Sequence, residues 1–237
     1  MKFSVIVPAH NEEKYIGACL KSIRASAELL PECSVEILVV LNRCNDRTEE
    51  ISKSFGARIV GEDEKNISKI RNAGAKAATG DVIVTLDADS WMAQNTLVEI
   101  KRLLGSGKFI GGGSKIRPER ISLGILMSLL SLVPYVLVGG VPVGLFWCYR
   151  KDFELLGGFN EALISAEDLD FGQRLKKLGR SRGLRYGKLT KAHIITSCRK
   201  FDKFGDWFIF LNPRLVRQVF KGTDRKTSDG LYYEIER

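Results

Sequence analysis

The sequence predicts an α/β fold: a mostly parallel sheet with helices on both faces, followed by a C-terminal helical extension. Short apolar runs alternate with segments of helical periodicity through roughly the first ninety residues. The runs are continuously apolar, as is typical of strands buried on both faces of a parallel sheet. Polar residues follow directly on several runs, and ligands bind beyond the carboxyl ends of the strands in such sheets.

Strand and helix alternate along this half of the chain. The predicted strands are residues 5–8 (VIVP), 36–41 (EILVVL), 57–61 (ARIVG) and 81–86 (DVIVTL). The predicted helices are residues 15–23, 46–55 and 67–78. Asn11 is the expected N-cap of the first helix, with Glu12 and Glu13 in its first turn, where acidic residues are favoured. The strand ends should place Asn42, Asp87 and Asp89 at one edge of the sheet.

Residues 121–149 form a long stretch without a charged residue, 29 positions in all. Prolines and glycines divide it into a strand, VGLFWCY, and a helix of roughly 17 residues, the lower limit for a membrane span. Three interpretations are open: a buried core helix, a membrane-surface or re-entrant helix, and a single span. A span is disfavoured because it would separate the two aspartates from everything after the break. Gly124, Ser128 and Ser131 form a small-residue stripe that allows close packing against another element.

The composition bounds the class of protein. With 237 residues and 44% apolar content, the chain can form a substantial core without disulfides. The five cysteines include no C-x-x-C pair. This argues against a disulfide framework or a zinc cluster, and for a reducing compartment. The N-terminal apolar run is too short for the core of a signal peptide.

The net charge of +9 is concentrated toward the C-terminus, because residues 176–226 carry 15 Lys or Arg and 3 Asp. Such a segment can bind phosphates, anionic lipid or nucleic acid. It also contains aromatic residues such as Phe204 and Trp207, which predicts an amphipathic helix on an anionic membrane surface. No RNA-binding motif accompanies these residues, so we expect no nucleic-acid partner. We expect a cytoplasmic protein bound peripherally to the inner face of the cell membrane.

Asp87 and Asp89 are two residues apart at a predicted strand end, so their side chains should leave the same face of the pleat. No Lys or Arg is adjacent in the sequence, and two carboxylates there repel unless they are solvated or neutralised by a cation. Mg²⁺ and Mn²⁺ prefer oxygen ligands and usually bridge to substrate phosphates. For an isolated D-x-D pair, solvated loop aspartates are the commoner alternative.

Four segments resemble the family 2 glycosyltransferases, which have the nucleotide-diphospho-sugar transferase fold. They are VIVPAHNEE, IRNAGAKAATGDVIVTLDADS, FWCYRKDFELLGGFNEAL and AEDLDFGQRLKKLG, in the family's order and approximate spacing. The resemblance implies an inverting, metal-dependent transfer of a sugar, expected to be a hexose. The donor would be a nucleotide-diphosphate sugar, the acceptor a hydroxyl on a lipid-linked or soluble molecule, and the cofactor Mn²⁺ or Mg²⁺. We expect a catalytic domain at 1–198, divided into a nucleotide-binding half (1–90) and an acceptor half (91–198), and a basic extension at 199–237.

The resemblance also implies roles for single residues. Asp87 and Asp89 would bind the metal, and Asp168 would be the general base that takes the proton of the acceptor hydroxyl. His193 would be a further ligand of the metal or the diphosphate. The donor site would be lined by Pro8, Ala9, His10, Glu12, Asn42, Arg71, Asp87 and Ala88.

Several of these residues have a structural alternative. Ser165 and Asp168 match a capping box, in which Asp168 would serve only a helix terminus. Arg71 can be a surface ion-pair partner, His10 a polar residue entering a helix, and His193 a half-exposed strand residue. Asn42 stands where family members often carry an acidic residue against the nucleotide base, which leaves both UDP and GDP donors open.

Other protein classes fit less well. A dinucleotide-dependent oxidoreductase should show G-x-G-x-x-G after the first strand, and a P-loop NTPase a Walker lysine loop; the sequence has neither. The main non-enzymatic alternative is an inactive nucleotide-sugar-binding or membrane-surface module of the same fold. The presence of all three motif aspartates argues against that alternative.

Overall fold

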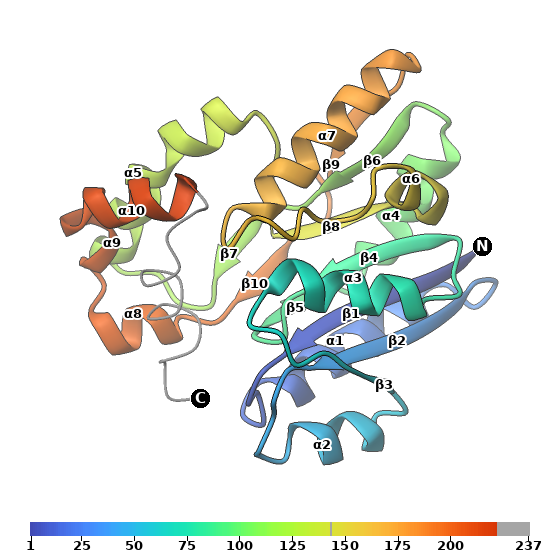
Figure 1. The fold of residues 1–237 in the computed structure, drawn as a ribbon, viewed down its shortest axis with the longest axis horizontal. Coiled ribbons are helices and arrows are strands. Elements are labelled where there is room, and N and C mark those ends of the chain that lie inside the picture. The colour runs from blue at the N-terminus through green and yellow to red at the C-terminus, as the bar shows by residue number, and fades with distance from the viewer. Residues whose placement is uncertain (143, 222–237) are drawn as a thin grey trace.

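The computed structural model describes residues 1–142 and 144–221, which form a seven-stranded and a three-stranded sheet with helices around them (Figure 1). In spatial order, the large sheet contains β3 (Arg58–Gly61), β2 (Ser34–Leu41), β1 (Lys2–Ala9), β4 (Val82–Leu86), β8 (Leu145–Tyr149), β6 (Phe109–Gly113) and β9 (Arg185–Lys188). The small sheet contains β5 (Ser90–Met92), β10 (Ile194–Thr196) and β7 (Ile116–Pro118).

The large sheet is mostly parallel, as predicted. Strands β3, β2, β1 and β4 run in the same direction, and only β8 is antiparallel to its two neighbours. The register pairs Ala9 at the end of β1 with Leu41 at the end of β2. The carboxyl ends of the central strands therefore meet at one edge, which faces the C-terminal helices (Figure 1).

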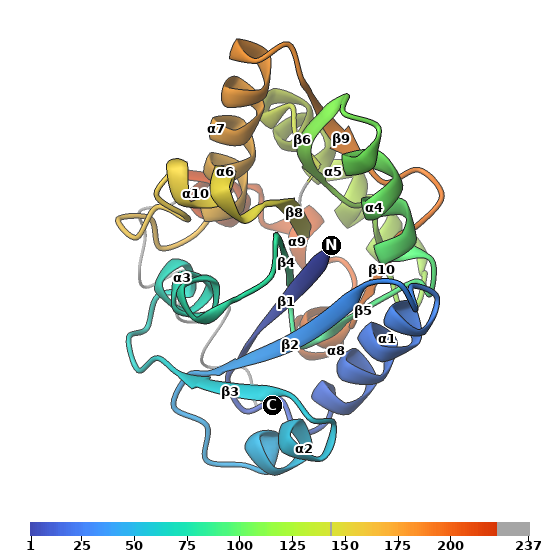
Figure 2. The ribbon, with the colours of Figure 1, turned by 90° about the vertical axis from the view of Figure 1, so that its right-hand side faces the viewer.

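Two apolar cores separate the sheet from its helices (Figure 2). On β1, Phe3 and Val5 belong to the core under α1 (Ile16–Glu28) and α4 (Thr96–Gly105), whereas Ile6 belongs to the opposite core. That second core lies under α3 (Ile67–Ala77), α6 (Arg150–Leu155) and α7 (Glu167–Ser181). The short helix α2 (Thr48–Ser54) covers the β3 end of the sheet. A Cβ on Gly74 would overlap Ile6 and Val40, so this position requires glycine for α3 to lie against the sheet.

The first helix begins later than the sequence predicted. Asn11 has a φ of 51° and lies outside α1, whose N-cap is Tyr15 without a side-chain hydrogen bond. The Oδ1 of Asn11 instead accepts a hydrogen bond from the backbone N–H of Asn45, at 2.9 Å. The predicted N-cap was therefore wrong, because Asn11 joins the loops after β1 and β2.

The uncharged stretch forms α5 (Leu123–Gly139), a helix of 17 residues with Pro134 inside it. It packs against α9 (Phe208–Leu211) and α10 (Pro213–Lys221), and α8 (Arg199–Phe204) precedes them in the chain (Figure 1). Two residues of the predicted small-residue stripe make this contact. A Cβ on Gly124 would lie 2.8 Å from Asp206, and the Ser128 hydroxyl donates to the Asp206 carbonyl at 2.8 Å. Ser131 bonds within its own helix, to the carbonyl of Ser128.

The other face of α5 is exposed. Leu126, Leu130 and Val133 recur at helical spacing, and each is at least 43% exposed. The helix is therefore packed on one side only, which excludes the interpretation of a fully buried core helix. Among the helices of the described residues, none has the length and apolar character needed to cross a membrane.

Candidate active site

Two loops meet where β1 and β2 end. The Nδ1 of His10 lies 2.6 Å from the Asn42 carbonyl oxygen, and the Asn42 N–H donates to the Ala9 carbonyl at 2.8 Å. Asn11 and Arg43, just beyond the two strands, both have φ of 51°, a conformation that residues other than glycine adopt at a cost. The hydrogen bonds hold the two loops together at the edge where ligands bind in parallel sheets.

Three of the predicted donor-site residues contribute backbone shape rather than polar groups. Pro8 and Ala9 are the last residues of β1, and Ala88 lies between the two motif aspartates. All three are buried, and Ala9 and Ala88 belong to the core under α1. Their side chains are therefore part of the core beneath the site.

Asn42 is fully buried, and its side chain holds the neighbouring loop. Its amide nitrogen donates to the carbonyl oxygens of Glu62 and Glu64, so both amide hydrogens are used within the chain. This differs from the expected contact with a nucleotide base, because the donors that would recognise a base edge are engaged. Asn42 instead joins the ends of β2 and β3.

Asp87 and Asp89 lie in a tight turn between β4 and β5, in which the Ser90 N–H donates to the Asp87 carbonyl at 3.0 Å. Each carboxylate contacts a different arginine. Arg71 Nη2 lies 2.8 Å from Asp87 Oδ1, and Arg199 Nη2 lies 2.7 Å from Asp89 Oδ2. The Asp87 side chain is 44% exposed and that of Asp89 14%, so ligands can reach Asp87 more readily.

Arg71 connects the two acidic motifs of the site. From α3 it binds Asp87 through one guanidinium nitrogen and Glu167, at the start of α7, through the other. Its guanidinium also lies 5.3 Å from the ring centroid of Phe159. Burial acts to lower the pKa of Arg71, but Asp87 and Glu167 outweigh it and leave the pKa raised. Arg71 is thus a buried bridge and not a surface ion-pair partner.

Asp168 is the second residue of α7, and the structure contradicts its interpretation as part of a capping box. The helix has no side-chain cap, and the Ser165 hydroxyl donates instead to the Val219 carbonyl at 2.8 Å. Ala166 precedes the helix with a φ of 58°, a strained conformation next to the acidic pair. Burial and the neighbouring Glu167 raise the pKa of Asp168 to about 7, against the opposing effect of Arg71. A carboxyl group with this pKa suits proton transfer near neutral pH.

His193 does not reach the aspartates in this structure. The register of the small sheet places it beside Ala93, whose N–H donates to the His193 carbonyl at 3.0 Å. Ser197 occupies the place opposite Asp89, with its N–H 2.9 Å from the Asp89 carbonyl oxygen. Partial burial, with Arg117 and Lys115 nearby, lowers the pKa of His193. The structure therefore does not bring the expected third metal ligand to the site.

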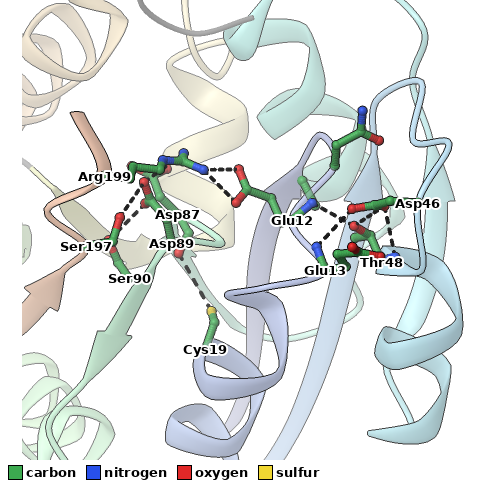
Figure 3. Close-up of polar contacts among 12 residues, drawn as sticks. Glu12, Glu13, Cys19, Asp46, Thr48, Asp87, Asp89, Ser90, Ser197 and Arg199 are labelled. Carbon is green, nitrogen blue, oxygen red and sulfur yellow. Dashed lines mark hydrogen bonds and ion pairs between the residues drawn. The ribbon is translucent and has the colours of Figure 1, made fainter. Parts of the chain in front are cut away.

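Arg199 is the site residue that the sequence did not single out. It begins α8 and forms ion pairs with Asp89 and Glu12, which come from the ends of β4 and β1 (Figure 3). Within a segment of many basic residues, nothing local distinguishes it. The available signal was its position three residues after the apolar strand β10, where a side chain can reach the same edge as Asp89.

The carboxylates fit a divalent cation that is bound together with a phosphate ligand. Within residues 1–142 and 144–221, no three acidic, His or Cys side chains form a metal-binding group. Mg²⁺ and Mn²⁺ commonly use one or two carboxylates and take their remaining ligands from water and substrate phosphates. Asp87 and Asp89 match this pattern, although Arg199 contacts Asp89 in the structure.

Comparisons with known proteins agree with this arrangement. The family model described as glycosyl transferase family 2 matches residues 4–119, a segment that runs from β1 to just beyond β7 and includes both motif aspartates. Residues 4–119 match glycosyltransferase family 2. Among curated relatives of this glycosyltransferase, AglE of Haloferax volcanii is 29% identical over 219 residues, which are 86% of this chain and 68% of AglE.

Solved structures of two further proteins are similar to this chain. The poly(ribitol-phosphate) β-N-acetylglucosaminyltransferase TarS of Staphylococcus aureus is 34% identical over 103 residues, 41% of the glycosyltransferase chain and 18% of TarS. The structure of TarS residues 1–349 with UDP-GlcNAc has a TM-score of 0.64 at 19% identity, over 99% of this chain and 71% of that one. The mannosyltransferase PcManGT of Pyrobaculum calidifontis, solved with GDP-Man and Mn²⁺, has a TM-score of 0.64 at 18% identity, over 97% of this chain and 67% of that one. These likenesses establish the fold.

Proposed function

We propose that this glycosyltransferase moves a sugar, with inversion, from a nucleotide-diphosphate donor to an acceptor hydroxyl, and that it uses Mn²⁺ or Mg²⁺. The observation that carries the proposal is the bridge made by Arg71. It brings Asp87, at the end of β4, and Glu167, at the start of α7, to a single arginine. The two acidic motifs lie 80 positions apart in the chain, and their meeting supports a donor site next to a base.

Each residue then has a role that its surroundings support. Asp168, half-buried with a raised pKa, would accept the proton of the acceptor hydroxyl as that oxygen attacks the anomeric carbon. Asp87 and Asp89 would hold the cation, which when bound supplies positive charge to the departing diphosphate. Arg71 would keep Asp87 and Glu167 in place, because a buried arginine between two carboxylates fixes both.

Hydrolysis of nucleotide sugars tests the reaction. We expect one or a few of a panel of UDP- and GDP-sugars to be hydrolysed slowly without acceptor, in the presence of Mn²⁺ and not in excess EDTA. Relatives bind donors of both kinds: UDP-GlcNAc in TarS and GDP-Man in PcManGT, the latter with Mn²⁺. Undiminished activity in EDTA would contradict the metal role. Binding of a nucleotide sugar without turnover toward any acceptor would favour an inactive binding module.

We further propose that the acceptor is lipid-linked and that the protein acts at the inner face of the cell membrane. The helix α5, with its exposed apolar face, packs against α9, and Trp207 just before α9 and Phe210 and Leu211 within it are each at least 40% exposed. The next helix, α10, buries Val216 and exposes Arg214 and Arg217, whose charge complements anionic headgroups.

This surface lies close to the proposed base. The carbonyl of Val219, in α10, accepts the hydrogen bond from Ser165, which is three residues before Asp168. A bilayer under α5, α9 and α10 would therefore present lipid-linked hydroxyls near the start of α7. For a soluble acceptor, the proximity of this surface to the start of α7 would bring no advantage.

Sedimentation with anionic vesicles tests the membrane surface. We expect binding that weakens in high salt without vanishing and is released by carbonate, because apolar contact and charge act together. Leu126→Glu with Leu130→Glu should abolish the part that resists salt. Leu155→Glu changes a leucine at the end of α6 that is more exposed than either of these, and it should leave binding unchanged. Complete release by salt alone would leave α5 without a membrane role, and resistance to carbonate would indicate an integral protein.

A further inference from the structure

Arg199 connects the C-terminal helices to the donor site. Its Nη1 lies 3.0 and 2.7 Å from the two carboxylate oxygens of Glu12, and its Nη2 lies 2.7 Å from Asp89 Oδ2. The guanidinium also lies 5.5 Å from the ring centroid of Tyr15. In Figure 3 the side chain lies between the two acidic groups and contacts both. Arg199, 187 positions from Glu12 in the chain, thus contacts acidic residues of the predicted nucleotide-binding half.

The burial of this cluster explains why an arginine is there. Glu12 and Asp89 have side chains only 3% and 14% exposed, and that of Arg199 is 13% exposed. Carboxylates withdrawn from water in this way are costly unless a cation pairs with them. Burial acts to lower the pKa of Arg199, but Asp89 and Glu12 outweigh it and leave the pKa raised. Arg199 is therefore charged, and it neutralises both carboxylates.

The positive charge of Arg199 lies beside Oδ2 of Asp89, an oxygen that the proposed metal would use. Two cations that approach one carboxylate repel each other, and the repulsion is strong where water is scarce. Asp87 is also paired with an arginine, Arg71, but its side chain is 44% exposed, so water screens the repulsion between that arginine and a cation more than it does at Asp89. For Asp89 to bind a divalent cation fully, Arg199 has to leave it.

Release of Arg199 would affect the C-terminal helices, because α8 is tied to them at its other end. Arg120, shortly before α5, pairs with Asp202 in α8 and with Asp206 just after it, at 2.6 and 2.7 Å. The Ser128 hydroxyl of α5 also donates to the Asp206 carbonyl. Among the described residues, Arg199 connects this helical group to Glu12 and Asp89 through its ion pairs.

We propose that Arg199 is a resident counter-ion that competes with the divalent cation for Asp89, and that its release couples occupation of the donor site to the position of α8. The inference rests on the proposed metal-dependent function and adds a regulation of that site. Coupling of this kind is reciprocal: whatever holds Arg199 on Asp89 weakens cation binding, and cation binding loosens α8. Before any chemistry occurs, metal affinity should therefore depend on a residue outside the D-x-D motif.

Direct Mn²⁺ binding to the full chain without donor, followed by calorimetry or by Mn²⁺ electron paramagnetic resonance, tests the competition. We expect Arg199→Gln to bind Mn²⁺ about tenfold more tightly than the wild type, because a positive charge beside Asp89 is removed. Lys203→Gln removes the same charge from an exposed position of α8 and should change affinity less than threefold. Unchanged or weaker Mn²⁺ binding by Arg199→Gln, while the wild type binds, would overturn the competition alone. If neither protein binds Mn²⁺, whether UDP or GDP is absent or present, the proposed metal role fails together with it.

Two further measurements keep the proposal testable if Arg199→Gln is unstable. The double variant Glu12→Gln/Arg199→Gln removes one of the two carboxylates that the single variant leaves unpaired, and it should also bind Mn²⁺ more tightly than the wild type. In the wild type, Mn²⁺ with UDP or GDP should increase amide hydrogen exchange in residues 199–204, at the start of the C-terminal helices. Exchange that is unchanged or slower at saturation would show that α8 is not released, and would overturn the coupling.

Discussion

Asp168→Asn should lower the turnover number by about 10²–10⁴, the usual contribution of a general base, while the donor dissociation constant stays within a few-fold. Asparagine has nearly the same shape but cannot accept the acceptor proton, and it can still accept the hydrogen bond from the Leu169 N–H. Steady-state kinetics and donor titration measure the two quantities separately.

Asp170→Asn is the matched control for this variant. Asp170 also lies in the first turn of α7, where it pairs with Arg174 at 2.7 Å, and its loss should leave turnover within a few-fold of the wild type. If Asp168→Asn retained turnover and lost only thermal stability, Asp168 would have a structural role instead.

The same carboxyl group predicts how activity depends on pH. Burial and Glu167 raise the pKa of Asp168 to about 7, and the base acts in its deprotonated form. The kcat/KM of the wild type should therefore rise as pH increases through about 7 and level off above it. Asp168→Asn should lack this rise. A flat wild-type profile between about pH 5.5 and 8.5 would contradict the assignment, since the free enzyme's essential base shapes that profile.

Asp89→Ala should abolish turnover and metal-dependent nucleotide binding while leaving the protein folded. The proposed cation would lose one of its two carboxylates, whereas Arg199 would keep its ion pair with Glu12. Nucleotide binding with and without Mn²⁺, together with circular dichroism, measures the effect.

Asp81→Ala is the control for the loss of a carboxylate near β4. Asp81 precedes the opposite end of this strand, where it accepts a hydrogen bond from the Lys2 N–H at 2.8 Å. Turnover should remain within a few-fold of the wild type. Metal-dependent binding that survives Asp89→Ala would mean that Asp87 alone holds the cation.

Much of the fold could be predicted from the sequence because its signals are local. Continuous apolar runs marked β1, β2, β3 and β4, and the glycines and prolines after residue 133 separated α5 from β8. The strand ends then placed Asp87 and Asp89 at the ligand edge, since parallel strands end together. The family's four segments supplied Asp168.

The partners of these side chains were set by tertiary structure alone. Asn11 bonds to the loop after β2 and does not cap α1, and Ser165 bonds to Val219, 54 positions away, and does not cap α7. Neither partner is visible in a local pattern, because a short polar side chain bonds to whichever group packing brings near it.

Strand register likewise decided which side chains lie near the proposed metal ligands. A shift of four positions along the segment that contains β10 decides whether His193 or Ser197 lies beside Asp89, and because side chains alternate with a period of two, such a shift leaves every side chain on the same face of the sheet. The sequence by itself therefore determined β1 to β4 with the helices between them, the division between α5 and β8, and the three candidate acidic residues of the site. Only the tertiary structure decided that Arg199 neutralises Asp89, because that contact depends on where packing places α8, whose Asp202 pairs with Arg120, a residue far away in the chain.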